Sequence, residues 1–378
     1  MIKYLDYNAS TPINEEVLDY MISVYKNIFG NADSRTHEHG NSAREIVEEA
    51  RVNVAKLLGI EKTEVIFTSG ATESSNILIL GLLEWGLEVG KKKIVTTKIE
   101  HKATLEPIKV LEKQGFKVDY VALDASGRID AGEAISKITD ETMLVTVQHV
   151  NNETGIIQPI KEIGDYCRKR KIYFHVDAAQ SFGKLVEELR DVEYDFLSAT
   201  AHKVYGPQGI GLLVMRKINY IKPPVKPLLW GGGQENGMRS GTIPVALVAG
   251  LGKACEVALN SYEDRNNHCK QVKQKILTEL NKSGLKFIIN GEQEFCMSNT
   301  INVSFIGVDS EALLVAMKKH CSISNGSACT AKDYNHSYVL KAMGLSEEIV
   351  ESAIRLSWGE GADVDVIKDL IKVVKQFA

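Results

Sequence analysis

Short apolar runs alternate with amphipathic segments of helical length between about residues 60 and 215. The apolar runs are typical of strands, and they cover Val65–Thr68, Lys93–Thr97, Lys117–Val121, Met143–Gln148, Ile172–Val176, Tyr194–Ala199 and Ile210–Met215. The segments between them predict helices at Glu73–Glu88, Lys102–Gln114, Asp130–Ile138 and Ile160–Arg170. Apolar strands joined by helices predict an α/β fold around a mostly parallel seven-stranded sheet that is buried on both faces.

The pattern changes on either side of this region. Two helices are expected before it, at Glu15–Phe29 and Ser42–Leu58, the second opening with Ser42 and Glu45 at capping-box spacing. After a proline-rich and a glycine-rich stretch, the expected elements are a long helix at Val245–Leu280, strands near Phe287–Asn290 and Thr300–Phe305, a helix at Ser310–His320 and a terminal helix. We therefore expect a large domain at 14–260, and a smaller α+β domain that combines 1–13 with 261–378.

Composition narrows the class of protein. The 378 residues carry a net charge of −4, so the charge balance does not favour a nucleic acid or an acidic membrane as partner. The longest apolar stretches, such as Ile77–Leu83, are too short to span a bilayer, and the amino terminus lacks the apolar core of a signal peptide. The six cysteines are scattered, without C-x-x-C or zinc-ligand spacing. These features predict a cytoplasmic protein with free thiols and no structural metal.

A lysine follows the sixth predicted strand. The apolar run that ends near Thr200 leads directly into His202 and Lys203. Burial at the end of a strand disfavours a charged amine and lowers its pKa. Lys203 is therefore a candidate for the covalent attachment of pyridoxal 5′-phosphate (PLP), with Thr200 and His202 near the phosphate.

Two other strand ends carry groups that PLP requires, and in a parallel sheet such ends meet at one edge. T-S-G-A-T-E-S at 68–74 is a strand-turn-helix pattern that can bind an anion. H-V-D-A-A-Q-S at 175–181 places Asp177 where it can pair with the pyridine nitrogen and Gln180 where it can donate to the ring oxygen. The alternative for Asp177 is the N-cap of a following helix.

Four further residues are candidates for chemistry. His101 follows a strand and either stacks on the cofactor or is structural, and Asn152 either bonds a ligand or makes a turn. Arg355 lies in an apolar run, where it either pairs with an internal acid or binds a substrate carboxylate. Cys329 lies among small polar residues in S-N-G-S-A-C-T, surroundings typical of an exposed, nucleophilic thiol.

These motifs resemble those of the NifS/IscS-type cysteine desulfurases, which are fold-type I PLP enzymes of aminotransferase class V. The resemblance runs nearly end to end. It includes Y-L-D-Y-N-A-S-T-P at 4–12, F-T-S-G-A-T-E-S at 67–74, H-V-N-N-E-T-G at 149–155, A-H-K-V-Y-G-P-Q-G-I-G at 201–211, G-G-G-Q-E-N-G-M-R-S-G-T at 231–242 and I-R-L-S at 354–357.

The resemblance implies a role for each matching residue. Lys203 is the Schiff-base lysine, Asp177 the partner of the pyridine nitrogen, His101 the ring-stacking histidine and Gln180 the donor to the ring oxygen. The phosphate cradle is Ala71, Thr72, Thr200 and His202, joined by Thr242 of a second subunit in a homodimer. Asn152 and Arg355 bind the carboxylate of L-cysteine, and Cys329 becomes a persulfide.

The implied activity is the conversion of L-cysteine to L-alanine with transfer of sulfur to Cys329. The sulfur then passes to an acceptor protein, either an iron–sulfur scaffold or an enzyme of tRNA or cofactor thiolation. A class V aminotransferase and a selenocysteine lyase are the alternative enzymes, and a PLP-binding regulator or scaffold is the non-enzymatic one. An aminotransferase needs no loop cysteine, so Cys329 argues against it.

Overall fold

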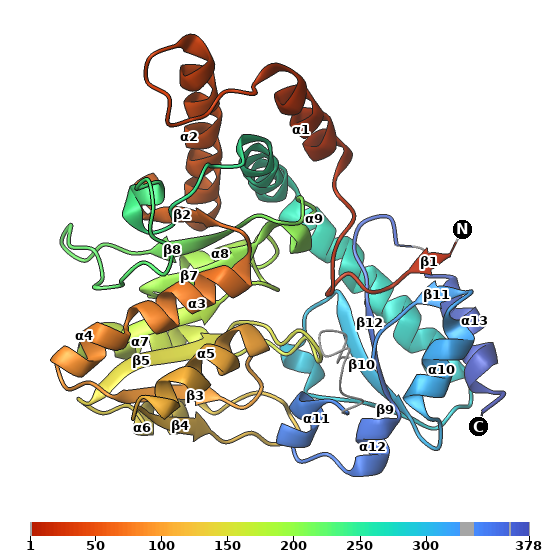
Figure 1. Ribbon diagram of the computed structural model, residues 1–378. Coiled ribbons are helices and arrows are strands. Elements are labelled where there is room, and N and C mark those ends of the chain that lie inside the picture. Colours follow the sequence, from red (N-terminus) through yellow and green to blue (C-terminus); the bar gives the residue numbers. More distant parts are fainter. Residues whose placement is uncertain (1, 326–335, 363, 378) are drawn as a thin grey trace.

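The predicted strands between residues 65 and 215 form one seven-stranded sheet in the computed structural model, which describes residues 2–325, 336–362 and 364–377 (Figure 1). They are β2 (Val65–Thr68), β3 (Lys93–Thr97), β4 (Lys117–Val121), β5 (Thr142–Gln148), β6 (Tyr173–Asp177), β7 (Phe196–Thr200) and β8 (Gly211–Met215). The order is β2-β8-β7-β6-β5-β3-β4, and only β8 runs antiparallel to its neighbours. The prediction of a mostly parallel seven-stranded sheet is confirmed.

Helices cover both faces of this sheet, because successive side chains of a strand point to opposite sides. Leu144 of β5 packs into the cluster on one face, and its neighbour Val145 into the cluster on the other. The first face is covered by α3 (Ala71–Gly81), α4 (Leu83–Glu88) and α5 (Lys102–Lys113). The second is covered by α2 (Glu38–Leu58), α6 (Ala131–Ser136), α7 (Ile160–Arg170), α8 (Val186–Arg190) and the first half of α9 (Val245–Lys282).

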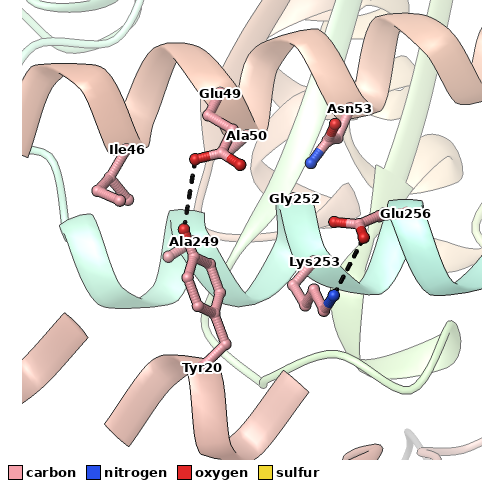
Figure 2. Close-up of a pocket in the computed structure, with 9 residues that line it drawn as sticks. All are labelled: Tyr20, Ile46, Glu49, Ala50, Asn53, Ala249, Gly252, Lys253 and Glu256. Carbon is pink, nitrogen blue, oxygen red and sulfur yellow. Dashed lines mark hydrogen bonds and ion pairs between the residues drawn. The ribbon is translucent and has the colours of Figure 1, made fainter. Parts of the chain in front are cut away.

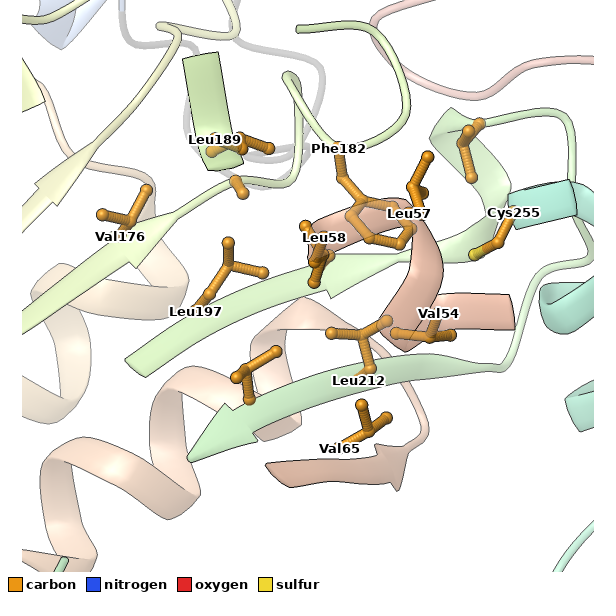
Figure 3. Close-up of a cluster of buried hydrophobic side chains, with 14 of the residues drawn as sticks. Val54, Leu57, Leu58, Val65, Val176, Phe182, Leu189, Leu197, Leu212 and Cys255 are labelled. Carbon is orange, nitrogen blue, oxygen red and sulfur yellow. The ribbon is translucent and has the colours of Figure 1, made fainter. Parts of the chain in front are cut away.

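Figure 3 shows part of the second face. Val54, Leu57 and Leu58 at the end of α2 lie against the sheet residues Leu197 and Leu212. All five side chains are at most 2% exposed. Burying side chains of this size favours folding by roughly 1.5–3 kcal/mol each, so this contact holds α2 against the sheet.

A three-helix layer formed by α1 (Glu15–Asn27), α2 and α9 packs closely at one end of the molecule. Figure 2 shows Gly252 of α9 next to Ala50 of α2, with Tyr20 of α1 and Lys253 at the edge of a shallow pocket. A Cβ atom on Gly252 would lie only 2.4 Å from the Ala50 Cα. The absence of a side chain at residue 252 is therefore what lets α2 and α9 approach this closely.

The rest of the chain forms the smaller α+β unit that the sequence predicts. β9 (Phe287–Ile289), β10 (Thr300–Phe305) and β12 (Ala353–Ser357) make an antiparallel sheet, and β1 (Lys3–Tyr4) pairs with β11 (Cys321–Ser322). Its helices are α10 (Ser310–Met317), α11 (Tyr338–Ala342), α12 (Glu347–Glu351) and α13 (Val366–Val374). Four single 3₁₀ turns complete the described elements: η1 (Lys62–Glu64), η2 (Ala201–Lys203), η3 (Glu235–Gly237) and η4 (Gln293–Phe295).

Helix α9 connects the two units. Residues such as Cys255 and Ala258 in its first half belong to the core against the large sheet, whereas Cys269 and Ile276 belong to the core of the smaller unit. In Figure 1 the helix runs from the top of the large sheet to the smaller one. The domain boundary predicted at residue 260 lies within this helix and stays a prediction.

Several local predictions are wrong. Helix α2 begins at Glu38, where the His37 ring accepts a hydrogen bond from Gly40 N at 3.1 Å, so Ser42 lies inside the helix and does not cap it. The helix predicted at Glu73–Glu88 is two helices that meet at Leu82.

Within the part of the chain that the structure describes, no helix has the length and apolar character needed to cross a membrane.

Candidate active site

A cavity of about 530 Å³ opens at the carboxyl ends of the strands of the large sheet and is closed on one side by β12 of the smaller unit. Most of the predicted site residues line it, namely Ala71, Thr72, His101, Asn152, Asp177, Thr200, His202, Lys203 and Arg355. These residues are far apart in the sequence. The parallel arrangement of β3, β5, β6 and β7 brings their carboxyl ends to one edge, as the sequence predicts.

One end of the cavity is formed by the start of α3. Ala71 is the first residue of this helix, Gly70 is its N-cap, and Thr72 follows in the first turn. The first N–H groups of a helix have no partner within it, and they carry the positive end of the helix dipole. Thr200, the last residue of β7, lies beside this turn, because its Oγ1 would be 3.8 Å from a Cβ on Gly70. This end of the cavity suits a phosphate.

Lys203 lies three residues after Thr200, on the single 3₁₀ turn η2 that follows β7. Its side chain is half-buried, so it is less enclosed than the sequence indicates. The adjacent His202 is strongly affected by its surroundings, since burial, followed by the charges of Lys203 and Lys184, lowers its pKa to about 4. His202 is therefore neutral at pH 7 and can offer an N–H to an anion.

Asp177 ends β6 and is buried, with 5% of its surface exposed. Its Oδ1 accepts a hydrogen bond from Ala179 N at 2.9 Å, which makes a local turn. The next α-helix in the chain, α8, begins only at Val186. The alternative that Asp177 caps a helix is therefore wrong, and its carboxylate faces the cavity.

His101 has the structural role that was one of its two alternatives, and its stacking on the cofactor stays a prediction. It is the N-cap of α5, where its Nδ1 accepts a hydrogen bond from Ala103 N at 3.1 Å. That bond leaves the proton on Nε2 in the neutral ring. Burial lowers the pKa of His101, the charges of Lys203 and Lys102 lower it further, and Asp177 opposes them. A neutral imidazole with a fixed tautomer thus lines the cavity.

Arg355 and Asn152 form the wall that the smaller unit shares with the large one. The guanidinium donates from Nη2 to Asp6 Oδ1 at 2.6 Å and from Nη1 to the carbonyl of Asn152 at 2.8 Å. Arg355 therefore pairs with an internal acid, Asp6, which is one of the two alternatives that the sequence left open. Its Nε and the Oδ1 of Asn152 are nevertheless buried without a hydrogen-bond partner, so both retain capacity for a ligand.

Among the described residues, Gln180 and Thr242 are predicted site residues that do not line the cavity. Gln180 is buried and donates from Nε2 to the carbonyl of Asn8 at 2.9 Å, while its Oε1 has no partner. Thr242 is exposed. Cys329 lies outside the described residues. The roles expected for these three residues stay predictions.

Sequence reasoning assigned no role to three buried polar residues beside the cavity. Asn8 donates to the carbonyl of Asn152 at 3.2 Å and to Thr300 Oγ1 at 3.0 Å. Glu100 precedes His101 in E-H-K-A at 100–103, and Glu153 follows Asn152 in H-V-N-N-E-T-G at 149–155. Both motifs carry the family resemblance, and that position was the only signal available. Burial raises the pKa of Glu100 to about 8 and that of Glu153 to about 7.

The residues present fit PLP. The helix start and Thr200 suit its phosphate, Lys203 its aldehyde, and Asp177 a protonated pyridine nitrogen. The unsatisfied Arg355 Nε and Asn152 Oδ1 add two polar groups for an amino-acid substrate at the opposite wall. The fold and this cavity together define a PLP-dependent enzyme of fold type I.

Comparisons with known proteins agree with this class. The aminotransferase class-V family model matches residues 3–367, and the chain belongs to this family, whose cofactor is PLP. Curated relatives include "Cysteine desulfurase IscS" of Rickettsia bellii (strain OSU 85-389), which is 42% identical over 98% of this chain and 90% of its own length. The protein of the same name from Rickettsia massiliae (strain Mtu5) is 43% identical over 94% of this chain and 86% of its own.

Solved structures give the same result. A "NIFS-LIKE PROTEIN" superposes with a TM-score of 0.90 at 35% identity and covers 100% of this chain and 99% of its own. The structure titled "SspA in complex with cysteine" has a TM-score of 0.81 at 38% identity, over 94% of this chain and 98% of its own.

Proposed function

We propose that this chain is a cysteine desulfurase, which converts L-cysteine to L-alanine and leaves the sulfur as a persulfide on Cys329. The observation that carries the proposal is the cavity that unites Lys203, Asp177 and His101 with Arg355. The relatives named above as cysteine desulfurases, and the neighbour solved with cysteine, support the choice of substrate.

The chemistry divides between cofactor and protein. When bound, PLP supplies a carbonyl that condenses with amines and a ring that makes the substrate α-proton acidic. Asp177 holds the proton on the pyridine nitrogen, and the Lys203 amine removes and returns protons on the substrate. His101, neutral and with its proton on Nε2, packs beside the ring and can donate that proton. Ala71, Thr72, Thr200 and His202 bind the phosphate, and Gln180 donates to the ring oxygen.

Arg355 orients the substrate by its carboxylate, to which its Nε, without a partner in the protein, can donate. Asn152 can donate to the same carboxylate only from its side-chain N–H group, and its unpartnered Oδ1 can accept from the substrate amine. With the substrate so held, the Cys329 thiolate attacks the substrate sulfur. A new S–S bond forms, the carbon–sulfur bond breaks, and the electron pair of that bond stays on the carbon skeleton. Protonation of that carbon and release of the product give L-alanine, so atoms and electrons balance without an external oxidant.

The site is completed in a homodimer, in which Thr242 of the partner subunit contacts the phosphate. The segment that contains Thr242 exposes large apolar side chains: Tyr220 is 97% exposed, Ile221 73% and Trp230 81%. Such a patch is typical of a protein interface. We expect the enzyme to act in the cytoplasm and to pass its sulfur to an iron–sulfur scaffold or a thiolation enzyme.

Product analysis tests this proposal. Incubated with L-cysteine and a thiol reductant, the PLP-loaded protein should release L-alanine and sulfide in equal amounts. Conversion of the substrate to a keto acid would support a class V aminotransferase instead. A selenocysteine lyase would act on L-selenocysteine and leave L-cysteine almost unused.

A further inference from the structure

A carboxylate next to Asn152 has no role in the chemistry above. Glu153 is 1% exposed and is held on both sides of its backbone, because its N–H donates to Asn151 Oδ1 at 2.9 Å and its carbonyl accepts from Asn302 Nδ2 at 3.2 Å. Its Oε2 accepts a hydrogen bond from the hydroxyl of Ser337. An ionisable group is rarely buried this completely without a reason.

Ser337 is the N-cap of α11. Its Oγ accepts a hydrogen bond from Leu340 N at 3.0 Å while its proton goes to Glu153. Helix α11 in turn packs through Val339 and Leu340 against Ile99, which lies two residues before His101. The single hydroxyl of Ser337 therefore joins a helix of the smaller unit to the loop after β5.

The backbone just before residues 326–335 is also hydrogen-bonded close to Asn152 and Glu153. Ser324 and Arg355 exchange two backbone hydrogen bonds, with Ser324 N donating at 3.3 Å and Arg355 N donating at 2.5 Å. Arg355 also donates to the carbonyl of Asn152, the residue before Glu153. The stretch before residue 326 is thus bonded to Arg355, and the stretch after residue 335 is bonded through Ser337 to Glu153, the neighbour of Asn152.

We propose that Glu153 is a positioning residue for sulfur transfer: through Ser337 it fixes the start of α11, which comes after Cys329 in the sequence, relative to Asn152 and Arg355. The inference rests on the proposed function. The distance between a nucleophile and its target is controlled by the points at which the chain is attached, and poor placement reduces the rate of transfer. Nothing in this role requires Glu153 to touch the substrate or the cofactor.

Single-turnover kinetics can separate placement from binding. Glu153→Leu removes the acceptor, and Ser337→Ala removes the donor. Each variant of the PLP-loaded enzyme should form the Cys329 persulfide about tenfold more slowly, as expected for a displaced reacting group. The rate at which L-cysteine changes the visible absorbance of the cofactor should stay within about twofold, because substrate binding uses other residues. The double variant should be no slower than either single one, since both break the same contact.

Two further variants keep the test decisive. Glu153→Gln retains an oxygen that can accept from Ser337, and it should recover most of the persulfide rate if Glu153→Leu loses it. Ser346→Ala is the matched control, because Ser346 is the N-cap of the next helix, α12, and makes no side-chain capping bond. It should behave like the wild type in both measurements.

Normal persulfide rates in both Glu153→Leu and Ser337→Ala would overturn the inference, as would losses that multiply in the double variant. Should Glu153→Leu fail to fold, Glu153→Gln and Ser337→Ala decide the question: the inference requires a slow Ser337→Ala beside a near-normal Glu153→Gln. A wild-type enzyme that forms no persulfide would instead refute the proposed function itself, and this inference with it.

Discussion

At the scale of single residues, the chemistry depends on which thiol can ionise. Cys167 and Cys255 lie in helices with no exposed surface, and burial raises both pKa values, that of Cys167 to about 12. Such thiols stay protonated and unreactive at neutral pH. Cys329, among small polar residues in the sequence, is the cysteine expected to differ.

We therefore predict that Cys329→Ser abolishes sulfide release but keeps the visible absorbance of bound PLP, because Lys203 and the phosphate site are unchanged. Cys296→Ser is the control: the Cys296 thiol lies 3.4 Å from the Thr154 carbonyl, a bond that a serine hydroxyl can replace, and it is not among the cavity-lining residues. Its activity should stay near wild type. Loss of PLP absorbance in Cys329→Ser would mean that this cysteine has a structural role.

Glu100 leads to a prediction about stability and pH. Burial, together with the charge of Asp177, raises its pKa to about 8, against hydrogen bonds from Thr97 and Gln148 N that lower it. Between its ordinary value of 4.5 and about 8, the folded state binds more protons than the unfolded state. Stability therefore falls as pH rises through this window, by up to about 1.4 kcal/mol per pH unit.

Glu100→Gln removes this titration, so its free energy of unfolding should depend less on pH between 5 and 8 than that of the wild type. Denaturant unfolding at several pH values measures the difference between the two proteins. Glu88→Gln, which changes an exposed carboxylate at the end of α4, should run parallel to the wild type. Parallel curves for Glu100→Gln and the wild type would show that Glu100 is already ionised at pH 5.

At the scale of elements, the close packing of α2 and α9 is the feature most sensitive to a single atom. Gly252→Ala would place its Cβ 2.4 Å from the Ala50 Cα, so the two helices must move apart. We expect a loss of about 1–3 kcal/mol in unfolding free energy, as for other overpacked cores. Lys253→Ala removes two partly exposed ion pairs, with Glu256 and Glu16, and should change stability by less than about 1 kcal/mol. Equal effects of the two substitutions would contradict this view of the interface.

The same elements explain how far the sequence could predict the fold. Six of the seven strands of the large sheet are short, mostly apolar runs that were predictable because they are almost completely buried on both faces. The edge strand β4 is only partly buried. β1 and β11, of two residues each, are too short for any periodic pattern. The start of α2 was missed because a histidine, His37, supplies its cap, whereas the sequence offered a serine and a glutamate inside the helix.

The site was predictable to the extent that it lies at strand ends. Lys203 and Asp177 follow directly from the parallel sheet. The ion pair of Asp6 with Arg355 and the contact of Glu153 with Ser337 join residues far apart in the chain, and no local pattern reports such pairs. Only the structure could reveal that these contacts surround the expected carboxylate site.

At the scale of the whole molecule, the proposed homodimer predicts that a residue outside the cavity affects cofactor binding. Thr242→Val should weaken PLP binding severalfold, because one hydrogen bond to the phosphate of the other subunit is lost. Thr278→Val, on the exposed surface of α9, should bind PLP normally. Equilibrium titration of the apo-protein with PLP, together with sedimentation to establish the dimer, measures both. A monomer with full PLP affinity would contradict the shared site.

Locating the transferred sulfur tests the proposed desulfurase activity of this chain most directly. The PLP-loaded enzyme is mixed with L-cysteine in the absence of a reductant or acceptor, and its proteolytic peptides are weighed by mass spectrometry. We expect one extra sulfur atom on the peptide that contains Cys329 and an equal amount of L-alanine in solution. Alanine formation with an unmodified Cys329, or extra sulfur on a different cysteine, would contradict this expectation.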